Sequence, residues 1–107
     1  MQFLAIGHYV VDPDLPRRAR AGRVEEVRYA WDAYLDQTLR QAWTRSDGQA
    51  PILLLEAATA DELKDRLDHS PYVQARVVNW EVVELAPFHP YSALFHHADD
   101  EAIGSAR

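Results

Sequence analysis

The sequence predicts a single α+β domain in which two helices accompany a four-stranded antiparallel sheet. Three observations lead to this prediction. The chain has 107 residues, which suffice for only one domain, and 48% of them are hydrophobic. Strand-like and helix-like segments also alternate along it. This composition permits a packed core and argues against global disorder. So small a domain buries a modest share of its surface, and oligomerisation is a common remedy.

The first half reads as strand, helix, strand. Residues 2–11 alternate as a strand that is apolar on both faces, and Pro13 and Pro16 end it because proline cannot continue a β-ladder. A helix follows from Pro16, firmest over 23–37, and residues 38–45 form the second strand. In that strand we expect Leu39, Gln41, Trp43 and Arg45 on one face and Arg40, Ala42 and Thr44 on the other. The helix carries one apolar stripe, made by Val24, Val27, Trp31, Tyr34 and Leu35.

The second half repeats the alternation. Asp47-Gly48 is a strong hairpin signal, and the apolar run at 51–57 indicates a central strand covered on both sides. Thr59 and Glu62 have the spacing of a capping box, which predicts a helix from there to about Leu67. The fourth strand lies within 73–85, with Val78, Trp80 and Val82 sharing a face.

This order predicts a ferredoxin-like βαββαβ domain over residues 1–90, followed by a tail at 91–107 that contacts a partner and then frays. Right-handed crossovers place both helices on one face of the sheet. The other face is also apolar, and an exposed apolar face of that size needs a partner. The simplest partner is an identical chain packed sheet to sheet.

Composition also excludes several classes of function. The net charge of −6 disfavours nucleic-acid partners, although Arg17, Arg18, Arg20 and Arg23 form a local basic cluster that is either solvated or an anion site. The absence of cysteine removes disulfides and thiolate chemistry and suits the cytoplasm. No signal peptide or run of about 20 apolar residues is evident, so no membrane partner is expected.

Three stretches carry a resemblance to a known family. They are Thr38–Trp43, where Arg40 and Trp43 match a Trp-Arg-x-x-Trp-Arg run, then Glu26 in the first helix, and His89-Pro90 after the last strand. The chain resembles the dimeric α+β barrel superfamily and is most similar to its muconolactone isomerase-like branch. The resemblance implies a homodimer or ring of dimers without cofactor. It also implies a small-molecule substrate for an isomerase or cyclase. The superfamily also contains cofactor-free monooxygenases.

Proton transfer on such a substrate needs a base and a group that holds the negative oxygen. Glu26 is a candidate base, or else a solvated helix glutamate. Arg40 is a candidate anion binder, or else a structural partner of Glu26 or Glu56. His8 is the second candidate base, or else a satisfied core histidine.

Aromatic side chains are expected to bind the substrate, or else to form core and interface packing. His89 is a candidate for closing the pocket, or else a surface histidine. No metal site is expected, because the adjacent pair His96-His97 cannot face one way. The interpretation is therefore a cofactor-independent isomerase or cyclase, with a phenol monooxygenase or a non-catalytic ligand-binding protein as alternatives. The aromatic candidates are Tyr29, Trp31, Tyr34, Trp43 and Trp80.

Overall fold

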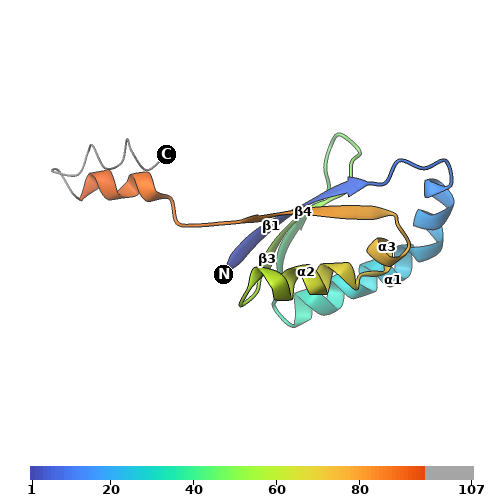
Figure 1. The fold of residues 1–107 in the computed structure, drawn as a ribbon, viewed down its shortest axis with the longest axis horizontal. Coiled ribbons are helices and arrows are strands. Elements are labelled where there is room, and N and C mark those ends of the chain that lie inside the picture. The colour runs from blue at the N-terminus through green and yellow to red at the C-terminus, as the bar shows by residue number, and fades with distance from the viewer. Residues whose placement is uncertain (96–107) are drawn as a thin grey trace.

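The computed structural model describes residues 1–95 as a four-stranded antiparallel sheet with helices (Figure 1). The spatial order of the strands is β2-β3-β1-β4, which is the order of a ferredoxin-like fold. The predicted fold class is therefore confirmed. The elements along the chain are β1 (Gln2–Tyr9), α1 (Leu15–Leu35), β2 (Leu39–Trp43), β3 (Ile52–Glu56), α2 (Ala60–Asp68), α3 (Pro71–Gln74), β4 (Val78–Glu84) and the 3-10 helix η1 (His89–Leu94).

The three α-helices lie on one face of the sheet (Figure 1). The core forms between them and that face, where Phe3, Ala5 and Leu55 pack with Leu63 and Leu67 of α2. Side chains on the opposite face belong to alternate positions of the same strands, such as the cross-strand pairs Leu4–Leu54 and Ile6–Ile52. Within residues 1–95 no helix packs on that second face.

Side-chain caps start the two helices of the second half. The Thr59 hydroxyl accepts a hydrogen bond from the Glu62 amide at 3.1 Å, as the capping-box spacing predicts. The Ser70 hydroxyl accepts from the Val73 amide at 3.3 Å and starts α3, with Pro71 in its first turn. Helix α3 is a short element that the sequence did not predict.

Strand β2 differs from the predicted alternation of faces. It is an edge strand of the sheet, paired only with β3. A bulge also separates Leu39, which pairs with Leu55, from Gln41, which pairs with Leu54. Because the bulge inserts one extra residue, Leu39 and Gln41 face opposite sides of the sheet and the simple alternation fails.

The apolar stripe of α1 does not pack against the sheet of its own chain. Trp31 of this stripe is 56% exposed, and its four companions are exposed to a similar degree. The inward face of α1 instead presents small residues, with Ala33 buried and Ala30 half-buried. Small side chains hold the helix close to the sheet yet leave space beside it, and this space forms the candidate site.

The chain leaves the domain after β4. The Leu85 amide still donates to the Gln2 carbonyl at 2.9 Å, and the chain then runs past the end of β4 and carries η1 away from the sheet (Figure 1). The radius of gyration is 17.7 Å, whereas a compact chain of this length has about 13 Å. The predicted fraying of the tail falls mainly on residues 96–107, which lie outside the described residues. None of the helices described is long and apolar enough to cross a bilayer.

Candidate functional site

A cavity of about 490 Å³ lies between α1 and the helix-covered face of the sheet. We call it the main cavity. Most of its wall is apolar, because β2, β3 and β4 contribute Ala42, Leu53 and Val78. Its polar groups come mainly from α1, from α3 and from the ends of strands. They are Tyr9, Arg23, Glu26, Thr44, Tyr72 and Trp80.

Glu26 is the acidic side chain of this cavity. It is half-buried on the inward side of α1, and its Oε1 accepts a hydrogen bond from the Tyr72 amide at 2.9 Å. The turn that starts α3 at Ser70-Pro71 presents that amide to it. Burial raises the pKa of Glu26, and the amide hydrogen bond lowers it by a smaller amount. The net shift moves this carboxylate toward the range that suits a general base near neutral pH.

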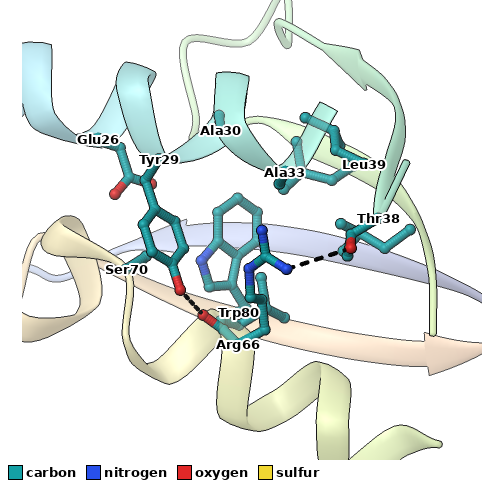
Figure 2. Close-up of a pocket in the computed structure, with 12 residues that line it drawn as sticks. Glu26, Tyr29, Ala30, Ala33, Thr38, Leu39, Arg66, Ser70 and Trp80 are labelled. Carbon is teal, nitrogen blue, oxygen red and sulfur yellow. Dashed lines mark hydrogen bonds between the residues drawn. The ribbon is translucent and has the colours of Figure 1, made fainter. Parts of the chain in front are cut away.

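Trp80 forms the floor beneath Glu26. It pairs across the strands with Gly7, and a Cβ at Gly7 would lie 3.0 Å from the indole ring and 2.7 Å from the Cβ of Ala50. Glycine is therefore required there for the ring to lie flat on the sheet. The indole Nε1 is buried and has no hydrogen-bond partner among the described residues. Figure 2 shows this nitrogen on the side of the ring that faces Tyr29.

A smaller space of about 40 Å³ lies behind Trp80, and we call it the inner pocket (Figure 2). It shares Glu26 and Trp80 with the main cavity. Arg66 closes it by extending over the Tyr29 ring, 5.8 Å from the ring centroid, and by pairing with Asp36 at 2.8 Å. The Tyr29 hydroxyl donates to the Arg66 carbonyl at 2.7 Å. This side of the site is thus rigidly built, whereas the main cavity is open.

Tyr72 is a site residue that the sequence did not indicate, and Arg23 was predicted only as one member of a basic cluster that is either solvated or an anion site. Burial raises the pKa of Tyr72, and a hydrogen bond with Arg23 partly offsets that effect. Two other arginines of the basic cluster bind groups outside the main cavity. Arg17 pairs with Asp14 at 2.6 Å, and Arg18 donates to the Ala75 carbonyl at 3.0 Å. Arg23 lies one turn before Glu26, so helical spacing placed it on the same face as the predicted base.

A second hollow, also of about 490 Å³, opens between α1 and the edge strand β2. We call it the β2 groove. Trp31 and Tyr34 stack in it with ring centroids 5.3 Å apart, and Arg40 lies on its strand side. The groove is continuous with the main cavity, since Val27, Ala30, Leu39 and Ala42 line both. Ala30 and Leu39 also line the inner pocket, so the three spaces adjoin one another beside these two residues.

The predicted site residues are therefore divided among several places. Glu26 and Trp80 share the main cavity, where Trp43 lies at the rim, and Tyr29 lines the inner pocket. Trp31, Tyr34 and Arg40 line the β2 groove. No salt bridge of Arg40 with Glu26 or Glu56 occurs in the part of the chain that the structure describes.

Two predicted residues lie away from this cavity in the single chain. His8 is on the opposite face of the sheet, where its Nε2 lies 3.0 Å from Glu81 Oε1, and it is exposed rather than in the core. His89 begins η1 and projects from the domain with the rest of that segment (Figure 1). Neither side chain lines the main cavity with Glu26.

No protein-family model matches the sequence, and no curated protein is recognisably similar to it. Solved structures do match. Muconolactone isomerase superimposes with a TM-score of 0.68 at 22% identity, over 82% of this chain and 91% of that one. The 5-chloro-2-hydroxyhydroquinone dehydrochlorinase of Burkholderia phenoliruptrix AC1100, solved with 2,5-dihydroxybenzoquinone, gives 0.64 at 14%, over 84% and 98%. At these identities the likeness establishes the fold, and at that level the predicted resemblance to the muconolactone isomerase-like branch is confirmed.

Proposed function

We propose that the chain is a cofactor-independent isomerase or cyclase that moves a proton on a small unsaturated lactone, organic acid or polyketide-like molecule. One observation carries the proposal: the Glu26 carboxylate lies half-buried in a largely apolar cavity with a raised pKa. A carboxylate in that state is a stronger base than a solvated one, because less water stabilises its charge. The cavity volume of about 490 Å³ suits a ligand of this size.

The chemistry requires a partner for the negative oxygen. When Glu26 takes a proton from a carbon next to a carbonyl, the bonding electrons move to the carbonyl oxygen and form an enolate. Arg23 lines the main cavity together with Glu26 and is the donor we assign to that oxygen. Glu26 then returns the proton to a different carbon, which completes an isomerisation. Arg40, on the strand side of the adjoining groove, is assigned to a substrate carboxylate.

The structural likenesses support this choice. Two proteins with this fold carry names that describe reactions on small oxygenated molecules, one an isomerase and the other a dehydrochlorinase. A shared fold is an argument by analogy, whereas the position of Glu26 is an observation on this chain.

Proton exchange is the direct test. We expect the protein to catalyse the incorporation of deuterium from D₂O at the carbon next to the carbonyl of an unsaturated γ-lactone. NMR spectroscopy measures this incorporation for a panel of such lactones. The substitution Glu26→Gln keeps the shape and the acceptor for the Tyr72 amide but removes the base, and should slow exchange by about 100-fold or more.

The neighbouring residue gives a matched control. Glu25 is 63% exposed and lies 3.4 Å from Arg28 on the outer side of the same helix. Glu25→Gln should therefore leave exchange unchanged. Equal rates for wild type and Glu26→Gln would remove Glu26 from the mechanism. Oxygen consumption with a phenolic substrate would favour the monooxygenase alternative, and a thermal shift by an unaltered ligand would favour a binding protein.

The helix-free face of the sheet supports a homo-oligomer as the working form. Leu4, Ile6, Ile52 and Leu54 line its centre, and the described chain covers them with no helix. We assign a second copy to this face, because a face of this kind is self-complementary about a two-fold axis. Light scattering during size-exclusion chromatography should give at least a dimer at micromolar concentration, and a lone monomer would contradict the assignment.

A further inference from the structure

Tyr72 of α3 lies along one face of α1. The positions that it contacts are spaced three or four residues apart, so they share that face. Its backbone amide donates to Glu26 Oε1 at 2.9 Å, and its hydroxyl donates to the Ala19 carbonyl at 2.7 Å. Its ring lies against Gly22, where a Cβ would touch the ring at 3.4 Å. A single residue thus bonds to α1 at positions about two turns apart.

Arg23 belongs to the same face of α1 and interacts with the Tyr72 hydroxyl. In an α-helix the amide of Arg23 is the partner of the Ala19 carbonyl, so the bond from Tyr72 meets α1 at the turn that carries Arg23. The hydroxyl gives its one proton to that carbonyl, and only its lone pairs remain for a guanidinium, which is a donor without lone pairs. The hydroxyl is therefore an acceptor toward Arg23.

The charge of Arg23 is available to a substrate. Within residues 1–95 no carboxylate forms a salt bridge with Arg23, whereas Arg17, Arg28 and Arg66 each pair with an acid. An arginine without an ion pair samples many rotamers, and ordering them costs free energy when an anion binds. Fixing the guanidinium beforehand lowers that cost. The Tyr72 hydroxyl can supply this restraint, because Tyr72 and Arg23 line the main cavity together.

The backbone of Tyr72 is held in place by bonds other than those of its side chain. A capped turn starts α3 directly before it, and the Val77 amide donates to the Tyr72 carbonyl at 2.8 Å. Arg18 of α1 donates to the Ala75 carbonyl at 3.0 Å and so ties the end of α3 to the same helix. The position of the amide that binds Glu26 therefore does not depend on the Tyr72 hydroxyl.

We propose that Tyr72 is a positioning residue that holds the base and the anion binder of the site in a fixed relation to each other. Its amide fixes Oε1 of Glu26, and its hydroxyl fixes the guanidinium of Arg23. Because the two restraints use different atoms of one residue, a substitution can remove the hydroxyl and keep the amide. The catalytic consequence rests on the proposed function, whereas the restraint on Arg23 does not.

Tyr72→Phe tests the hydroxyl in the lactone exchange assay, because phenylalanine keeps both the ring on Gly22 and the amide on Glu26. We expect kcat for proton exchange to fall about tenfold and KM to change by less than about twofold, since Arg23 acts on charge that develops in the transition state. Disorder of α3 would instead remove the amide bond and raise the pKa of Glu26 in the pH–rate profile, because that bond lowers it. A lowered kcat with an unchanged profile therefore assigns the loss to the hydroxyl.

A double-mutant cycle shows whether the hydroxyl acts through Arg23. In the Arg23→Gln background, Tyr72→Phe should slow exchange by less than about twofold, since the guanidinium that it positions is gone. Losses that multiply would show that Tyr72 acts independently of Arg23 and would overturn the proposal, as would a Tyr72→Phe variant as fast as wild type. Thr59→Ala is the control, because it removes one hydrogen bond from α2, which contributes no residue to the main cavity. It should leave the rate unchanged below its melting temperature.

An NMR measurement tests the positioning without any substrate. The order parameter of the Arg23 Nε–H bond should exceed that of the exposed Arg20 in the same helix and should fall to a similar value in Tyr72→Phe. Equal order parameters for the two arginines in the wild type would contradict the proposal, as would an Arg23 value that Tyr72→Phe leaves unchanged. Ordering of Arg23 in a wild type that exchanges no lactone proton would contradict the proposed function alone.

Discussion

Helix α2 packs two leucines against the sheet, whereas helix α1 presents alanines and a glutamate to it. Leu63 and Leu67 are buried in the core, and α2 starts with a hydroxyl cap at Thr59. Helix α1 is more than twice as long, has no side-chain cap and keeps its large apolar residues exposed. Helix α2 is therefore the better packed of the two helices, while α1 leaves space between itself and the sheet.

The largest expected effect compares one leucine from each helix. Leu63 is 1% exposed, so Leu63→Ala should lower the free energy of unfolding by about 3 kcal/mol. Leu35, at the end of α1, is 61% exposed. Leu35→Ala should therefore change the free energy of unfolding by less than about 0.5 kcal/mol. Urea denaturation of both variants measures the difference. Similar losses would mean that α1 is as well packed as α2.

The next prediction concerns strand β1, which belongs to the same half of the chain as α1 but is tightly packed. Strand β1 is tight, because a methyl group at Gly7 would lie 2.7 Å from Ala50 and 2.9 Å from the Pro51 carbonyl oxygen. Gly7→Ala should cost about 2 kcal/mol and should shift the fluorescence of Trp80. Gly48→Ala in the hairpin, where a Cβ meets nothing within 4 Å, tests backbone strain without a clash. A stability of Gly7→Ala equal to that of wild type would contradict the packing described.

A smaller effect concerns the capped start of α2. Thr59→Ala removes the acceptor for the Glu62 amide and should lower the free energy of unfolding by about 1 kcal/mol. Thr59→Ser keeps the hydroxyl and should restore most of that loss. Thermal melting of the pair measures it, and equal melting temperatures for Thr59→Ala and wild type would show that α2 does not depend on its cap.

The smallest effect is the pH dependence that Glu26 gives to stability. Its pKa is raised on folding, so between the unfolded and folded pKa values the native state holds the proton more tightly than the unfolded state. This group therefore favours folding less as the pH rises through that window. Glu26→Gln should raise the melting temperature at pH 7, and the gain should shrink by pH 4. A gain independent of pH would show that the carboxylate is not desolvated.

The sequence predicted the strands, their order and the start of α2, because each depends on local periodicity or on a cap. Periodicity also identified the apolar stripe of α1, but periodicity does not say which surface covers such a face, and this stripe is exposed in the single chain. The bulge at Arg40 has no composition signal, and it reverses the face of every later residue in β2. Glu26 was found from its family spacing, whereas Arg23 was absorbed into a surface cluster and Tyr72 depended on the unpredicted α3.

Ala30 lines the main cavity, the inner pocket and the β2 groove. Leucine or methionine at this position would suit the helix nearly as well as alanine. The added atoms would nevertheless subdivide the shared space into compartments. A substitution at this single position would thus change the size of the molecules that the cavity admits, without altering Glu26 or the strands around it.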